Sequence, residues 1–211
     1  MIQTSAKEDV VKSHSSLKRL IVSISLAALT CLSAHAQTDV ALSVYGAFSG
    51  TTNNNNIQES PANAAGGIVE LRHIHNPLVG YEVTYSFNRA NQVYAFTGLS
   101  PVRPASVSAD AHEITADWVV SVHAGSFRPF ALAGAGILIN QPTGNQNGTQ
   151  SATTGVYVYG GGLDWGLLPH IGLRFQYRGN LYKAPELTNA FGSINAFKHT
   201  AEPMIGAYFR F

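Results

Sequence analysis

Cysteine and charged residues are both scarce in this sequence of 211 residues. Charged residues make up 12% of the chain, against roughly 25% in an average globular domain. Lys and Arg number 13 against 12 Asp and Glu and form no basic patch, which excludes the charge footprint of a nucleic-acid-binding protein. Hydrophobic residues make up an ordinary 45%, which excludes a disordered chain. The low charge is compatible with two classes of protein: a soluble fold with a weakly charged surface, or a protein whose outer surface does not face water.

The first 36 residues have the features of a secretory signal peptide. Lys18 and Arg19 precede the segment LIVSISLAALTCLS, in which every residue is apolar or small. Ala34 and Ala36 then give the small-x-small pattern that signal peptidase cleaves. We therefore predict that residues 1–36 are a signal peptide with a long n-region, cleaved after Ala36.

The single cysteine, Cys31, offers lipoprotein processing as the alternative for this segment. Thr30 is a poor small residue before such a cysteine, so cleavage by signal peptidase is preferred. Because Cys31 is then removed, the mature domain, residues 37–211, contains no thiol, which excludes disulfides and cysteine-based zinc sites. The uncharged stretch 129–163 does not predict a membrane-spanning helix, because Pro142 and several glycines interrupt it.

The mature chain alternates between apolar and polar residues with a period of two. Residues 79–87, VGYEVTYSF, show this most clearly, with Val, Tyr and Phe on one face and Gly, Glu, Thr and Ser on the other. Successive side chains of a strand point to opposite faces, so this segment is predicted as a strand with one apolar face. The same reasoning predicts seven further strands, although the two faces of 130–139 are ambiguous: 40–48, 69–72, 113–122, 130–139, 157–165, 173–178 and 202–211.

The predicted connections alternate in length. Three are tight turns with Pro, Gly or Asn chemistry: 75–77, 124–126 and 168–170. The other four are long and polar: 50–65, 89–110, 140–154 and 180–198. Tight turns at one end and long loops at the other are typical of an outer-membrane barrel, with periplasmic turns and extracellular loops.

The charged residues indicate which face is inside. Of the 19 charged residues after residue 36, ten fall in predicted strands, and all ten lie on the polar face. A charge at the lipid midplane costs roughly 2–4 kcal/mol, so this segregation predicts a polar lumen inside an apolar exterior. We expect an ion network that fills the lumen, since eight strands leave little interior space. Its predicted members are Glu70, Arg72, Glu82, Glu113, Asp117, Asp164, Arg174, Arg178, Glu202 and Arg210.

Three segments resemble the small eight-stranded outer-membrane β-barrel family, the type of the membrane domain of outer-membrane protein A. They are RPFALAGAGILI (128–139), YGGGLDWGLLPHIGLRFQYRG (159–179) and the terminal GAYFRF. The resemblance covers the whole mature chain. It implies an all-β fold, an eight-stranded antiparallel up-and-down transmembrane β-barrel in the outer membrane, with both termini in the periplasm.

The resemblance also implies a role for the last strand. Family members end in a terminal Phe after alternating hydrophobic residues, a signal for the barrel-assembly machinery. The residues of this chain that match the signal are Ile205, Ala207, Phe209 and Phe211. Pro203 fits this strand less well, because proline removes a ladder hydrogen bond, and we expect it near the loop end or at a bulge.

Several residue patterns suggest chemistry and have a simpler explanation. Glu82, Glu113 and Asp117 resemble paired catalytic carboxylates, but the lumen arginines are the expected partners. His73 and His75 have metal-ligand spacing, but they adjoin a proline turn with no clear third ligand, so an interfacial pair is expected. We therefore predict no metal and no cofactor.

Two further patterns are weaker still. His123 and Ser126 do not make a complete hydrolase set, because they lie at a tight turn without an obvious acidic partner. The glycines at 160–162 open no helix, so strand curvature and close packing are favoured over a phosphate loop. Aromatic residues of the apolar faces are expected to form girdles at the membrane interfaces: Tyr85, Phe87, Trp118, Tyr157, Trp165, Tyr177 and Phe209.

The function expected from these observations is that of a non-enzymatic surface barrel, whose four long extracellular loops bind, adhere or protect. A narrow pore is the second hypothesis, and a lipid-modifying enzyme is the third. The expected partners are outer-membrane lipid and, through the C-terminal strand, the barrel-assembly machinery. Nucleic acid is not expected as a partner, and the barrel is expected to be a monomer.

Processing can be tested on the protein recovered from outer membranes. N-terminal sequencing should begin at Gln37, because the small-x-small site ends at Ala36. A sequence that begins at Cys31, or an intact N-terminus, would show that the predicted cleavage is wrong.

Overall fold

The computed structural model describes residues 37–76, 78–96, 104–144, 148–188 and 194–211 of the chain. The predicted signal peptide, with its cleavage residues Ala34 and Ala36, lies outside these residues and stays a prediction. Among the described residues, none belongs to a helix long and apolar enough to cross a membrane.

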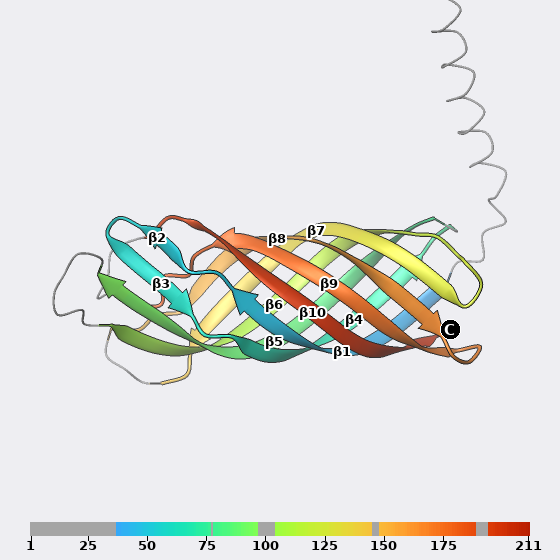
Figure 1. Ribbon diagram of the computed structural model, residues 1–211, viewed down its shortest axis with the longest axis horizontal. Helices are drawn as coiled ribbons and strands as arrows, with labels where there is room; N and C mark the ends of the chain where they lie inside the picture. The colour runs from blue at the N-terminus through green and yellow to red at the C-terminus, as the bar shows by residue number, and fades with distance from the viewer. Residues whose placement is uncertain (1–36, 77, 97–103, 145–147, 189–193) are drawn as a thin grey trace, which may run out of the picture. The chain divides into compact units, whose positions relative to one another are not determined.

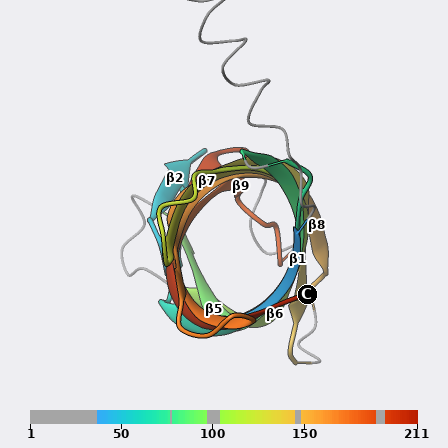
Figure 2. The same cartoon turned by 90° about the vertical axis from the view of Figure 1, so that its right-hand side faces the viewer.

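Eight long strands close into one antiparallel barrel, which the view along its axis shows as a ring (Figure 2). Each long strand pairs with the next in the chain, and the last pairs with the first. The eight strands are inclined to the long axis (Figure 1). They are β1 (Gln37–Ser49), β4 (Ala64–Ile74), β5 (Val79–Phe96), β6 (Ala105–Ser121), β7 (Phe127–Pro142), β8 (Ala152–Gly166), β9 (Ile171–Lys183) and β10 (Phe197–Arg210). The predicted eight-stranded antiparallel up-and-down barrel is confirmed.

Two short strands form a hairpin inside the first long connection. They are β2 (Thr52–Asn54) and β3 (Ile57–Pro61), and β3 also pairs with the end of β5. Asn55 and Asn56 connect them with φ angles of 50° and 60°. Positive φ at both central residues is the mark of a type I′ turn, and Asn tolerates it better than most residues. This asparagine-rich segment, predicted only as part of a long polar connection, therefore forms a hairpin.

The barrel is apolar outside and polar inside. Large apolar side chains such as Leu42, Trp118 and Tyr157 are more than half exposed on the outer face. Their strand neighbours point inward and are mostly polar, as with buried Ser43 and Asp117. A barrel that dissolved in water would have the opposite arrangement, so this outer face is suited to lipid.

Several strands are longer than the alternation predicted. Strand β5 continues to Phe96 and β6 starts at Ala105, so most of the predicted loop 89–110 is paired strand. On the outer face of this extension, Arg89 and Asp110 form an exposed ion pair. The apolar-outward pattern that indicates a membrane strand stops here, while the backbone ladder continues. The sequence pattern therefore located the apolar band and missed the strands beyond it.

The expected position of Pro203 is wrong. It lies in the middle of β10, opposite Tyr177, in an unbroken register with β9. The register between β1 and β10 is the same on both sides of Pro203, so the strand has no bulge there. The pairing of the two strands is interrupted at Gly46 and Ala47 of β1, which face Pro203 and its neighbour. The hydrogen bond that proline cannot donate is thus lost locally on the β1 side, and Pro203 itself is exposed on the outer face.

The inside-out arrangement predicts where an added charge is harmful. Val83 lies on the outer face and pairs with Leu71 and Ala116, well inside the apolar band. Val83→Arg should lower the free energy of unfolding in phospholipid vesicles by roughly 2–4 kcal/mol. Asn53→Arg, on the exposed hairpin, is the matched control and should change it by less than about 0.5 kcal/mol. Equal losses in a urea titration would contradict the assignment of the outer face to lipid.

Candidate functional site

The lumen near the tight turns holds a cluster of buried ions, which we call the basal cluster. Arg72 Nη2 lies 2.6 Å from Glu82 Oε2, and Arg174 Nε lies 2.7 Å from Asp164 Oδ1. Arg174 also reaches Asp39 Oδ1 at 2.8 Å. The six members of the cluster have no exposed side-chain surface: Asp39, Glu70, Arg72, Glu82, Asp164 and Arg174. They come from β1, β4, β5, β8 and β9, so the cluster bridges the barrel across its width.

An aromatic ring completes the basal cluster. The guanidinium carbon of Arg72 lies 4.0 Å from the centre of the Phe130 ring, a distance typical of a cation–π contact. Phe130 points inward, which settles the face that the sequence left ambiguous. The ring fits because Gly162 lies opposite, where a methyl group would come within 2.7 Å of the ring. This is the packing role of the GGG segment.

A second buried group, the central cluster, lies farther along the lumen. Arg178 Nη2 lies 3.2 Å from Glu113 Oε1, and its Nη1 lies 3.8 Å from Asp117 Oδ2. The Arg178 guanidinium also donates hydrogen bonds to the Thr84 and Thr115 hydroxyls at 3.1 Å. Buried Glu202, which lies opposite Arg178 in the pairing of β10 with β9, is the fourth charged member of the central cluster.

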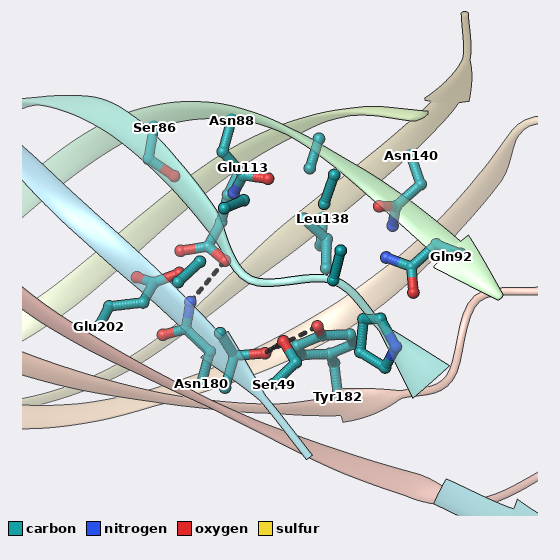
Figure 3. Close-up of a pocket in the computed structure, with 17 residues that line it drawn as sticks. Ser49, Ser86, Asn88, Gln92, Glu113, Leu138, Asn140, Asn180, Tyr182 and Glu202 are labelled. Carbon is teal, nitrogen blue, oxygen red and sulfur yellow. Dashed lines mark hydrogen bonds between the residues drawn. The ribbon is translucent and has the colours of Figure 1, made fainter. Parts of the chain in front are cut away.

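A cavity of about 40 Å³ adjoins the central cluster on the side of the long connections (Figure 3). This is space for about three water molecules, since each needs roughly 10–15 Å³. Glu113 and Glu202 lie at one end of the cavity, beside the Asn180 amide, and Gln92 and Asn140 lie at the other (Figure 3). Asn180 Nδ2 donates to Glu113 Oε2 at 2.9 Å.

The barrel mouth is covered by an apolar group, the mouth cluster. Its buried members come from β3, β5, β6 and the connection after β9: Ile57, Tyr94, Val107, Ala109, Ala184, Leu187 and Ile194. In the view along the axis, chain that follows β9 lies inside the ring (Figure 2). Tyr94 fixes this segment by donating a hydrogen bond to the Pro185 carbonyl at 2.7 Å. The connection after β9 therefore folds over the lumen (Figure 2), while the hairpin strand β3 continues the barrel wall beside β5.

One ion pair lies beneath the mouth cluster. Lys198 Nζ lies 2.8 Å from Glu59 Oε1 and 3.2 Å from Gln92 Oε1, and all three residues are buried. Burial raises the pKa of the Glu59 carboxyl above its ordinary value, and the Lys198 ammonium opposes part of that shift. The pair ties the hairpin strand β3 to the beginning of β10.

The structure places the ten predicted lumen residues as follows. Nine are buried within the barrel, and Arg210 is partly exposed near the tight-turn end, where its guanidinium carbon lies 4.8 Å from the Tyr208 ring centre.

Four further charged residues are buried and were missed by the sequence analysis: Asp39, Glu59, Arg128 and Lys198. Asp39 and Arg128 do alternate in phase with inward neighbours, so an extension of the period-two pattern to the strand ends would have found them. Glu59 and Lys198 carried no such signal, because they lie in segments predicted as loops.

The histidines take part in polar and aromatic contacts. His73 Nδ1 lies 2.9 Å from the Thr38 hydroxyl oxygen, and the centres of the His73 and Tyr81 rings are 5.2 Å apart. His123 Nδ1 accepts a hydrogen bond from Arg128 Nε at 3.3 Å. Within the described residues, no group of three or more His, Cys, Asp or Glu side chains is placed to hold a metal ion.

The residues of the predicted assembly signal lie on the outer face of the last strand. Ile205 and Phe209 are 48% and 46% exposed there, in phase with Ala207, and Phe211, the residue after β10, is 70% exposed. The Phe211 amide donates to the Thr38 carbonyl at 2.9 Å, so the terminal residue is joined to β1. This contact fixes the position of Phe211, while recognition by the assembly machinery stays a prediction.

Comparisons with known proteins agree with this architecture. A family model described as "Outer membrane protein beta-barrel domain" matches residues 24–200. The attachment invasion locus protein Ail of Yersinia pestis is 16% identical, with a TM-score of 0.51 over 84% of this chain and 100% of that chain. Neisserial surface protein A is 14% identical, with a TM-score of 0.52, and the match covers 84% of this chain and 98% of that protein. OprG of Pseudomonas aeruginosa is 10% identical, with a TM-score of 0.55, and the match covers 83% of this chain and 96% of that protein. No curated protein matches the sequence.

The basal cluster yields a test with a matched control. Arg174→Met removes the cation that lies within 3.6 Å of four buried acids of the basal cluster, and should reduce the free energy of unfolding by about 3–5 kcal/mol. Arg89→Met removes an arginine that is 60% exposed in its pair with Asp110, and should leave the free energy of unfolding nearly unchanged. Both variants are compared with the unchanged protein in the same lipid. Similar losses in the two variants would show that burial does not govern these ion pairs.

Proposed function

Because this chain belongs to the family of outer membrane protein β-barrel domains, we propose that it is a non-enzymatic surface barrel with a closed lumen. The protein is an outer-membrane β-barrel, and its long connections then face the cell exterior. Both termini and the three tight turns face the periplasm, the orientation general to bacterial outer-membrane barrels. The barrel acts through its exterior end, either in contact with other molecules or as a structural part of the cell surface.

The observation that carries this proposal is the filling of the lumen at three successive levels. The basal cluster bridges the barrel near the tight turns, the central cluster bridges it farther along, and the mouth cluster covers the outer end. Arg72, Arg174 and Arg178 have no exposed side-chain surface. A general diffusion pore needs a continuous water path, and these side chains occupy its place.

The histidine contacts support a non-enzymatic role. A hydrolase that uses a serine nucleophile needs a histidine base, and an acid commonly orients that base. The partner of His123 is the cation Arg128 and not a carboxylate, and burial together with this cation lowers the pKa of the imidazole. The lumen carboxylates Glu82 and Asp117 are close to arginines in the two ion clusters. These contacts favour a surface barrel over a lipid-modifying enzyme.

The exposed groups at the outer end favour uncharged polar partners. The hairpin β2–β3 presents Asn and Thr side chains. Ail, one of the similar structures, was solved in complex with the heparin analogue sucrose octasulfate, a polyanion. In the described part of this outer end, the exposed cations are Arg89 and Lys183, and Arg89 is paired with Asp110. This charge does not favour a polyanion, and hydrogen-bonding partners are proposed instead.

We also propose that the barrel is a monomer in contact with outer-membrane lipid. All eight long strands have both edges paired within the ring, so none offers an open edge to a second copy. The apolar outer face then contacts acyl chains around its circumference. No nucleic acid is proposed as a partner, because the chain has no basic patch.

Conductance tests the closed lumen directly. The full chain is expressed in a Gram-negative host, purified from outer membranes and added to a planar bilayer. Rare, small and flickering events are expected, because paired side chains fill the lumen. A stable, reproducible conductance, together with solute entry in liposome swelling, would contradict the closed lumen and favour the narrow-pore hypothesis.

The role of the last residue can be separated from its packing. Deletion of Phe211 should lower the fraction of heat-modifiable, folded protein in outer membranes. Refolding of the same purified variant into detergent should change less, because Phe211 is 70% exposed. Phe197→Ala, which truncates another exposed aromatic side chain of the same strand, is a control outside the terminal signal. Equal loss in both assays for the Phe211 deletion would indicate packing rather than recognition by the assembly machinery.

A further inference from the structure

The central cluster contains more carboxylates than cations. Arg178 is its single cation, and it faces the carboxylates of Glu113, Asp117 and Glu202. The nearest other cations have their own partners: Arg72 and Arg174 pair within the basal cluster, and Lys198 pairs with Glu59. With all groups ionised, the central cluster therefore has a net charge of −2. Buried charge of one sign is unfavourable unless something compensates it.

Two buried oxygen atoms at the cavity are without a partner. Within the described residues, neither Glu202 Oε2 nor Asn180 Oδ1 has a hydrogen-bond partner. Glu202 is 4% exposed and Asn180 is 1% exposed, and both residues line the cavity beside Glu113 (Figure 3). Buried polar atoms in proteins are almost always paired, so two free acceptors at one end of a polar cavity call for a hydrogen-bond donor or a cation. The net negative charge of the central cluster favours a cation.

The donor set at this end of the cavity has the chemistry of a hard-cation site. Carboxylate and amide oxygens are preferred by Ca²⁺, which accepts six to eight oxygen ligands, water included, in flexible geometry. The cavity of about 40 Å³ has room for one ion with one or two waters. Its rim includes Pro61, Ala62 and Ala64, which are exposed or partly exposed between β3 and β4, so the route to the cavity passes through the wall there and not through the mouth cluster.

We propose that this cavity binds a divalent cation of the Ca²⁺ type, held by Glu202, Glu113 and the Asn180 side-chain oxygen. A divalent ion neutralises the charge of −2 in one step. Mg²⁺ is less suited, because it requires near-octahedral geometry and gives up its water reluctantly. The bound ion joins β6, β9 and β10 across the lumen, so it stabilises the barrel from inside.

Thermal unfolding tests the proposal on the full chain, expressed in a Gram-negative host and purified from outer membranes in a neutral detergent. After treatment with EDTA and its removal, added Ca²⁺ should raise Tm by about 5 °C, and Mg²⁺ should raise it less. Glu202→Gln should abolish the response to Ca²⁺ and leave the ion-free barrel as stable or more so. Glu186→Gln, which changes an exposed acid of the long connection after β9, is the matched control and should respond like the unchanged protein.

A second measurement does not depend on the folding of a variant. Tb³⁺ emission should be sensitised by Tyr182, which lines the cavity, and Ca²⁺ should displace the Tb³⁺ more effectively than Mg²⁺. Glu202→Gln should weaken Tb³⁺ binding by about tenfold or more. The proposal is overturned if Ca²⁺ leaves Tm unchanged and does not displace Tb³⁺, or if Glu202→Gln responds as the unchanged protein does. A Tm that rises on acidification in EDTA, without any response to Ca²⁺, would show that the acids share a proton instead.

Discussion

Exclusion of water from the outer face of the barrel is the constraint on which the rest of this structure depends. In hydrocarbon, every backbone N–H and C=O group must find its partner within the protein. The pairing of β10 with β1 meets that demand by leaving no open edge in the ring of eight strands. Because charge in lipid is costly as well, charged side chains lie on the inward face of each membrane-spanning strand. Once inside, those charges are crowded together and must compensate one another.

The lumen is therefore a packed core made of ions rather than hydrocarbon. Arg174 contacts acids from four different strands, and Arg72 packs on the face of Phe130. Gly162 makes room for that ring. This arrangement links stability to function, because the contacts that compensate the buried charges are the same contacts that fill the water path. In the function that we propose, the barrel acts through its outer end and, in our further inference, binds an ion in the space beside Glu202.

The sequence predicted this fold because period-two alternation and the cost of charge in lipid act on every residue of the apolar band. Glu70, Arg72 and Glu82 could be placed inside from their phase alone. The prediction failed where that selection is absent. Beyond the apolar band, Arg89 can point outward, so the paired backbone there gave no strand signal. Pro203 was misplaced because a single lost hydrogen bond is tolerated within an otherwise continuous ladder.

The mouth and the cavity could not be predicted for a different reason. Leu187 and Ile194 are buried by contacts with β3, β5 and β6, segments distant in the sequence. Likewise, Glu59 and Lys198 are 139 residues apart and form one buried pair. Local periodicity contains no information about such contacts. Unpaired atoms such as Glu202 Oε2 become visible only when all the neighbours are in place.

Fluorescence quenching of Trp118 tests the inside-out arrangement most directly. Trp118 is 69% exposed on the outer face and pairs with Tyr81 and Ala133. Trp165→Phe leaves it as the single tryptophan of the chain. In vesicles, brominated acyl chains should quench its emission strongly, and aqueous acrylamide should quench it weakly. Strong quenching by acrylamide with little effect of brominated lipid would place this face in water and contradict the account.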